Sequence, residues 1–398
     1  MLELSINLIM YIAFSAFLIW KSKGISANAA IFLFYTLIAL FGVLIYDTPF
    51  YNWGYYNHLT DHTRNTISFP PLLFIFISFI IYYWSISGIN SLKITSIARL
   101  PRSIENALFI VSTLFLLYFL FLFRNMFFTT TTDFSDTYAD GINLDVLGFI
   151  GKYVLTIESG LDIFFVIFPF YLFSKKQKKA TKKGIIILIL FILASYVKAS
   201  IIASRGTIFF CFANLFFAFL MFRNMLTPKI VKIIKVGGLV TLGTFISLSI
   251  AISISRFGDL FFYSIASYFG EPFLNFPLIF WNYPKFMDGE YLAYQLLGGL
   301  PPKTPIWMGY FRTMPGSVYV DFGVAGSFLF FAIYAIVFKK IIGKVNTTIT
   351  FSQMYIYAYI VFQMIYGVFG FNILPLKVFA ISIILYILFR ATQIKEQK

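Results

Sequence analysis

The sequence SRFGDLFFYSIASYFGEPFLNF occupies residues 255–276, and FRTMPGSVYVDFGVAGS occupies residues 311–327. The two stretches open and close a long segment, 256–316, that is rich in aromatic and polar residues. Strongly apolar runs, 236–255 and 317–338, lie on either side of it. An apolar helix of about 20 residues is long enough to cross the hydrocarbon core of a bilayer. We therefore expect the segment to be one large extramembrane loop between two membrane spans.

The composition indicates that the rest of the chain is embedded in a membrane as well. Of the 398 residues, 60% are hydrophobic and only 12% are charged, whereas a soluble domain carries roughly 25% charged residues. So little charge cannot cover a soluble protein of this length. The 53 Phe and 26 Tyr residues suit lipid-facing and interfacial positions. The sequence predicts an all-α polytopic integral membrane protein that forms a single transmembrane domain over residues 1–398.

Eleven apolar runs are candidate membrane spans. They are 2–20, 28–46, 69–89, 104–123, 153–173, 185–203, 207–222, 236–255, 317–338, 351–371 and 377–390. With this number of spans, every Lys- and Arg-rich loop falls on one side, as the positive-inside rule requires. We expect about 11 transmembrane helices, a periplasmic N-terminus and a cytoplasmic C-terminus. The segment 256–316 then becomes a large periplasmic loop that carries short amphipathic helices.

The net charge has a membrane explanation. A formal charge of +15 would suggest nucleic-acid binding in a soluble protein. Here the basic residues cluster in short loops between apolar runs, so topology accounts for them, and we expect no nucleic-acid partner. The single cysteine, Cys211, lies in an apolar run, and one cysteine cannot form a disulfide within the chain.

Three arginines stand where spans meet the expected periplasmic loops: Arg205, Arg256 and Arg312. Guanidinium binds phosphate oxygens bidentately and never deprotonates. The helix that is expected to open at Thr207 adds free N–H groups, which favour an anion. The three arginines are therefore candidate ligands for the pyrophosphate of a lipid-linked substrate. Two plainer roles stay open, because Arg205 also suits an interface anchor and Arg256 also suits a local ion pair with Asp259.

Two carboxylates are the candidate catalytic groups. Glu271 sits among aromatic residues of the large loop, and Asp321 lies just inside the next span, close to Gly323 and Gly326. A sugar hydroxyl that attacks an activated donor benefits from a general base. We expect one of these two carboxylates to be that base.

The loop between these charged residues is strongly aromatic. The spacing of Phe269, Phe273, Phe276 and Phe280 predicts an amphipathic helix that lies in the membrane interface. We expect most of the loop's aromatic side chains to pack at the membrane surface. A minority is expected to stack on sugar rings.

His58 and His62 are four residues apart in the first expected outer loop. That spacing binds metal on a helix, but the rest of a ligand set is missing. We expect no metal and no other cofactor. His58 alone is a further candidate for a catalytic base.

Glu158 and Asp162 are also four residues apart, so they share one face of the fifth span. Charges inside a membrane span are costly unless they are paired. We expect these acids to pair with Arg205 or Lys198, or else to face a cavity.

Three motifs together carry a family resemblance. They are Ser204-Arg205-Gly206 at the start of a span, Arg256 leading into FFYSIASYFGEP, and DFGVAG at 321–326. This pattern resembles the O-antigen polymerases, often called Wzy, and most closely their oligosaccharide repeat-unit polymerase branch. The resemblance covers the second half of the chain in detail and the first half by span pattern.

The resemblance implies a metal-independent glycosyltransferase in the bacterial inner membrane, with its active site facing the periplasm. Such an enzyme transfers an undecaprenyl-pyrophosphate-linked glycan onto the non-reducing end of an incoming lipid-linked repeat unit. Carried over, Arg205 and Arg256 would bind pyrophosphate and Asp321 would be a family-type position, whereas Arg312 and Glu271 rest on position and chemistry. The implied partners are the lipid-linked oligosaccharide and polymer, membrane lipid and a chain-length-regulating co-polymerase.

Two other functions are compatible with many spans and a large outer loop. An O-antigen ligase would be expected to carry a catalytic histidine in that loop, and residues 256–315 contain none. A flippase for lipid-linked oligosaccharides would be expected to place charges in the middle of several spans and to keep its outer loops short. Here one outer loop dominates, which favours the polymerase.

Overall fold

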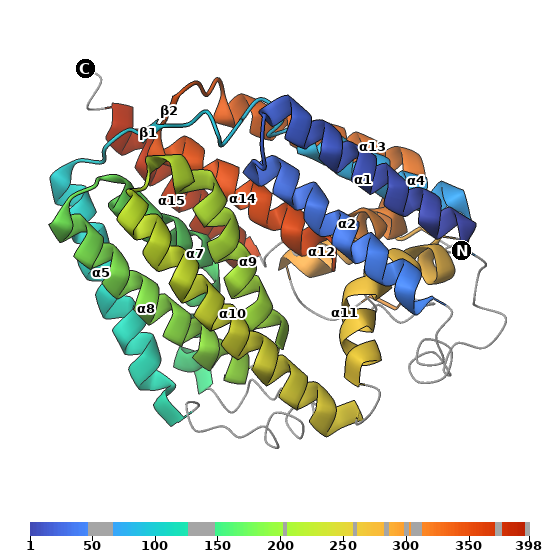
Figure 1. The fold of residues 1–398 in the computed structure, drawn as a ribbon, viewed down its shortest axis with the longest axis horizontal. Coiled ribbons are helices and arrows are strands. Elements are labelled where there is room, and N and C mark those ends of the chain that lie inside the picture. Colours follow the sequence, from blue (N-terminus) through green and yellow to red (C-terminus); the bar gives the residue numbers. More distant parts are fainter. Residues whose placement is uncertain are drawn as a thin grey trace. The chain divides into compact units, whose positions relative to one another are not determined.

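The structure, a computed structural model of the chain, is almost entirely helical (Figure 1). It describes residues 1–46, 67–125, 148–201, 205–257, 261–281, 286–297, 302–303, 313–370 and 376–394. The chain divides into two units, each built from separate stretches of sequence. The first unit contains residues 1–90, 257–344 and 360–376, and the second contains residues 91–256, 345–359 and 377–398.

The first unit is built from helices of both halves of the chain. Its elements are α1 (Leu2–Ser22), α2 (Ala27–Ile45), α4 (Phe69–Tyr83), α11 (Phe261–Asn275), the π-helix η5 (Phe276–Phe280), α12 (Glu290–Leu297) and α13 (Thr313–Ile342). The end of α14 (Phe351–Gly367) also belongs to this unit.

The second unit contains the middle of the chain. Its elements are β1 (Ser96–Ile97), α5 (Arg102–Leu122), α7 (Gly148–Ser174), α8 (Lys178–Ile201), α9 (Arg205–Phe222), the 3-10 helix η3 (Arg223–Met225), α10 (Pro228–Phe257), β2 (Thr348–Ile349), the start of α14, and α15 (Leu376–Ile394).

The helices coincide with the hydropathy pattern. All eleven apolar runs fall on helices, and seven helices in the described ranges are long and apolar enough to cross a membrane. The remaining four runs fall on α4, α10, α14 and α15. The prediction of a helical, multi-pass membrane protein is therefore confirmed, although β1 and β2 add one short parallel pair. The total of eleven spans and their direction stay predictions.

Buried polar side chains join the helices of the first unit. Asn28, at the start of α2, donates from Nδ2 to the carbonyls of Ile86 at 3.2 Å and Ile89 at 2.8 Å. The Tyr35 hydroxyl, also on α2, donates to the carbonyl of Met364 at 2.7 Å. Because a polar group buried without a partner is costly, these bonds hold α2 against the turn after α4 and against α14.

The helices α2 and α11 cross at two glycines. A Cβ atom at position 270 would lie 2.8 Å from the backbone nitrogen of Gly42 and 2.8 Å from the carbonyl carbon of Phe41. A Cβ atom at position 42 would meet the Gly270 carbonyl oxygen at an ordinary 3.5 Å. Close contact between backbones at small residues is typical of helix pairs in membranes. The start of the large loop is thus packed against the second helix of the chain.

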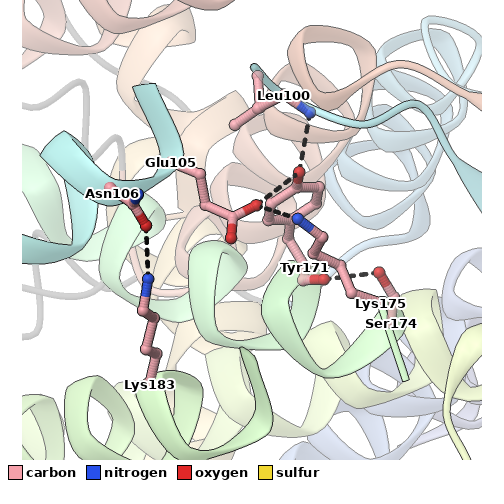
Figure 2. A network of polar contacts seen from close by, with 7 residues as sticks. All are labelled: Leu100, Glu105, Asn106, Tyr171, Ser174, Lys175 and Lys183. Atoms are coloured by element: carbon pink, nitrogen blue, oxygen red, sulfur yellow. Dashed lines mark hydrogen bonds and ion pairs between the residues drawn. The ribbon is translucent and has the colours of Figure 1, made fainter. Parts of the chain in front are cut away.

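In the second unit, a buried ion pair joins α5 to the end of α7 (Figure 2). The Glu105 carboxylate accepts hydrogen bonds from the ammonium group of Lys175 and, at 3.3 Å, from the hydroxyl of Tyr171. The Tyr171 hydroxyl in turn accepts from the backbone N–H of Leu100 at 2.8 Å. Part of the basic loop after α7 therefore fastens helices together rather than facing solvent.

The same end of the second unit carries the two strands and another polar pair. Residue 96 of β1 pairs with residue 348 of β2, and residue 97 pairs with residue 349. The ammonium group of Lys183 on α8 donates to Oδ1 of Asn106 on α5 at 2.6 Å (Figure 2). These contacts connect segments that are far apart in sequence, including the loops before α5 and α14.

Gly270→Ala is expected to lower the free energy of unfolding by about 1–3 kcal/mol, because its Cβ would collide with backbone that cannot move aside. Gly42→Ala is the matched control on the facing helix. Its Cβ has ordinary contacts, and alanine is the better helix former, so its stability should be unchanged or slightly higher. Thermal unfolding of the detergent-solubilised protein measures both, and equal stability of the two variants would contradict the crossing.

Candidate functional site

Of the three predicted pyrophosphate ligands, two lie at helix ends and one lies outside the described residues. Arg205 begins α9, two residues before the predicted start of that helix, and Arg256 lies in the last turn of α10. The side chains of both, and all of Arg312, fall outside the described residues. So do Asp259, His58 and His62. The arginine clamp therefore stays a prediction that rests on the positions of these residues in the chain.

Asp321 holds the start of α12. Its Oδ1 accepts the backbone N–H of Tyr291 at 3.1 Å, and its Oδ2 accepts the N–H of Leu292 at 2.7 Å. These amides belong to the first turn of α12, where N–H groups have no partner within the helix. The Asp321 carboxylate, which is 1% exposed, thus caps a helix that lies thirty residues earlier in the chain.

The backbone of α13 supports the same segment. The N–H groups of Met287 and Asp288 donate to the carbonyls of Val320 and Asp321, each at 3.1 Å. Directly after this, α13 is broken at Gly323, where φ is +64° and ψ is −166°. Only glycine adopts this conformation readily.

A ring fills the space beside the break in α13. A Cβ atom at position 323 would lie 3.0 Å from the ring of Phe286. The absence of a side chain at Gly323 therefore serves both the backbone conformation and the contact with Phe286. The first half of the DFGVAG motif, Asp321-Phe322-Gly323, therefore forms the surface against which residues 286–292 pack.

Aromatic stacking fixes the middle of the loop. The rings of Trp281 and Tyr319 are stacked with centroids 5.3 Å apart, and Phe276 meets Tyr319 edge-on at 5.3 Å. The Tyr319 hydroxyl donates to the Trp281 carbonyl, and Phe74 on α4 stacks against Phe276 at 5.5 Å. Sequence reasoning did not single out Tyr319, although its place two residues before Asp321 puts it on the motif that holds the loop.

The expected placement of the aromatic helix is wrong. The spacing does form a helix, α11, followed by η5, but Phe273, Phe276 and Phe280 are at most 1% exposed. Phe273 stacks on Tyr11 of α1 with centroids 5.2 Å apart. These rings are core residues of the first unit and pack against protein rather than lipid. An apolar helical face has the same periodicity in both cases, so the pattern alone could not separate them.

Glu271 is a buried carboxyl group whose side-chain partner among the described residues is the hydroxyl of Ser267. It lies on α11, outside the seven candidate spans, and is 8% exposed. Burial raises the pKa of the Glu271 carboxyl from its ordinary value of 4.5 to about 7, and a hydrogen bond from the Ser267 hydroxyl opposes part of this rise. A carboxyl that titrates near neutral pH can both accept and return a proton, which suits a general base.

Two acids and one lysine form a charged cluster inside the second unit. The ammonium group of Lys198 on α8 lies 2.7 Å from Oε2 of Glu158 and 2.9 Å from Oδ2 of Asp162, both on α7. Of the three alternatives expected for these acids, the structure shows pairing with Lys198. The ammonium group of Lys198 is therefore held by two carboxyl groups.

Neither a metal-binding cluster nor a similar known protein helps to define the candidate site. Among the described residues, no group of three or more His, Cys, Asp or Glu side chains is arranged to hold a metal ion. No protein-family model, no curated protein and no solved structure matches the chain. The site is therefore argued from its own residues.

Removing the cap at α12 should expose that helix to exchange. Asp321→Ala is expected to cost about 1–3 kcal/mol locally, because two amides lose a charged acceptor. Hydrogen exchange at the amides of Tyr291 and Leu292 should then become faster. Glu290→Gln, an exposed change in the same turn, is the control and should leave both amides protected. Unchanged exchange in Asp321→Ala would show that α12 does not depend on the cap.

Glu271 should make stability depend on pH. Its folded pKa of about 7 lies above the unfolded value of 4.5, so the folded state binds more protons between these values. Stability is then full below about pH 4.5 and falls as pH rises toward 7, by a total on the order of 3 kcal/mol. Glu271→Gln should remove this loss. Unfolding temperatures measured across this range check it, and an identical pH profile for the two proteins would contradict it.

Proposed function

We propose that the protein is an O-antigen, or surface polysaccharide, polymerase. It transfers an undecaprenyl-pyrophosphate-linked glycan onto the non-reducing end of an incoming lipid-linked repeat unit. The observation that carries the proposal is that the described parts of the segment between α10 and α13 pack against the helices of the first unit and bury Glu271. A loop built in this way suits a preformed site for chemistry on a membrane-anchored substrate.

The chemistry assigns a separate role to each charged group. A hydroxyl of the acceptor sugar attacks the anomeric carbon of the donor glycan, and Glu271 takes the hydroxyl proton. The bond between the anomeric carbon and the pyrophosphate oxygen breaks, so undecaprenyl pyrophosphate leaves with the bonding electrons. Arg205, Arg256 and Arg312 bind this leaving group. A hydrogen bond from a charged donor is worth about 1.5–3 kcal/mol, so two or three that strengthen in the transition state speed the reaction by several powers of ten.

Asp321 is better suited to positioning than to proton transfer. Each of its oxygens already accepts a hydrogen bond from an amide of α12, so both are engaged in holding that helix. We assign it the task of holding the loop in place, whereas Glu271 takes the role of the base. This assignment separates two carboxylates that sequence reasoning had treated as equivalent.

The reaction requires a particular placement in the cell. We infer eleven spans with the N-terminus and the large loop in the periplasm and the C-terminus in the cytoplasm of a bacterial inner membrane. The periplasm offers no nucleotide sugars, so the donor must arrive on a lipid. The partners are then lipid-linked oligosaccharide and polymer, membrane lipid and a co-polymerase that regulates chain length, and the reaction needs no cofactor.

A flippase for lipid-linked oligosaccharides is the second candidate. The observation in its favour is the cluster of Glu158, Asp162 and Lys198, because charges buried between spans often belong to transport pathways. The packing of the segment between α10 and α13 against the helices favours a polymerase over a flippase. The absence of histidine from residues 256–315 still argues against an O-antigen ligase.

Arg205→Ala and Arg256→Ala should each abolish long polysaccharide ladders on gels, while single repeat units still reach the surface. Loss of a phosphate ligand slows transfer but leaves transport of the repeat unit intact. Arg390→Ala is the control, because Arg390 is exposed on α15 and bonds the Tyr386 hydroxyl; its ladders should be normal. Normal ladders in both test variants would reject the clamp, and loss of single repeat units as well would favour the flippase.

A further inference from the structure

The cluster of Glu158, Asp162 and Lys198 lies where charge is most costly. Its members come from α7 and α8, both among the candidate membrane spans. Glu158 is completely buried, the Lys198 side chain is 11% exposed, and the Asp162 side chain is 25% exposed. With all three groups ionised, the cluster would carry a net charge of −1. An uncompensated charge in such surroundings costs several kcal/mol.

The two acids share one lysine but differ in burial. Lys198 donates a hydrogen bond to Oδ2 of Asp162 at 2.9 Å and lies 2.7 Å from Oε2 of Glu158. One ammonium group can balance the charge of only one of the two carboxylates. The Glu158 side chain is completely buried, whereas the Asp162 side chain is 25% exposed, so a negative charge is more costly on Glu158.

We propose that Glu158, Asp162 and Lys198 form a proton-binding site within the membrane domain, with the proton carried by Glu158. The site then holds one ammonium, one carboxylate and one neutral carboxylic acid, and its net charge is zero. Asp162 is the most exposed member of the cluster, so we infer that the proton exchanges past it. This proposal is independent of the polymerase proposal, because it assigns roles to none of the residues that the polymerase proposal uses.

The surroundings offer no alternative counter-charge among the described side chains. From α9, the group that faces the cluster is the Cys211 thiol, which is hydrogen-bonded to Ser195. From α15, Ile381 packs against Gly160, between the two acids in sequence.

Two other ionisable groups on the neighbouring helices have partners of their own. Glu105 on α5 pairs with Lys175, and Arg390 on α15 pairs with Tyr386. A metal cation does not suit the site either, because the ammonium of Lys198 occupies the space between the carboxylates and would repel it. The proton is the one cation that fits.

The proposal is tested by infrared spectroscopy of the full-length protein in lipid at neutral pH. The difference spectrum between wild type and Glu158→Gln should contain the C=O stretch of one protonated carboxylic acid and no carboxylate bands. The control is Glu290→Gln, which removes an exposed glutamate. Its difference spectrum should contain carboxylate bands only. A carboxylate signature from Glu158 would overturn the proposal and would indicate a second cation beside it, such as the guanidinium of Arg205.

The stability of Glu158→Gln and the infrared spectrum of Asp162→Asn provide a second, independent test. Glutamine resembles a protonated glutamate in shape and charge, so Glu158→Gln should fold and unfold at the wild-type temperature. Asp162→Asn replaces the carboxylate that holds Lys198, so the proton should leave Glu158 and its acid band should disappear as well. A Glu158→Gln protein that fails to fold, or an acid band that persists in Asp162→Asn, would contradict the assignment.

Discussion

The bonds from the carboxylate of Asp321 to the first turn of α12 are the interaction on which the candidate site depends. An isolated helix of eight residues is not stable in water, so α12 needs a partner that supplies acceptors for its free N–H groups. Asp321 supplies two, and the break at Gly323 leaves room for Phe286 beside it. Through these contacts, a segment that hydropathy describes as a loop becomes part of the helical core of the first unit.

The buried acids in the described part of the chain differ in how many hydrogen-bond donors and positive charges they contact. Glu105 has an ammonium partner, and Asp321 has two backbone amides. Glu271 has one hydroxyl, which is too little to offset its burial, so its pKa rises to about 7. Glu158 shares its ammonium partner with Asp162. Glu271 and Glu158 are therefore the two carboxyls to which we assign a proton, Glu271 in the proposed transfer reaction and Glu158 in the proposed site between α7 and α8.

Much of the fold could be read from hydropathy, and part of the charge pairing could be read from spacing. Glu158 and Asp162 lie on one helical face because they are four residues apart, and Lys198 is their confirmed partner. The aromatic loop could not be placed in the same way, since a helical stripe of Phe residues is satisfied equally by lipid and by other helices. Phe273 packs against Tyr11 because α1 and α11 meet in three dimensions, which no local pattern records.

Sequence alone determined the class of protein and the positions of its helices. Within a membrane, each helix must satisfy its backbone hydrogen bonds within its own segment, and its lipid-facing residues must be apolar, so each span is visible in the sequence as an apolar run. It also identified the charged residues to which we assign chemical roles. Only the tertiary structure decided which of them are buried and what they touch. Those outcomes depend on partners far along the chain, such as Tyr35 with Met364 and Asp321 with Tyr291, and contacts between distant residues leave no periodic trace in the sequence.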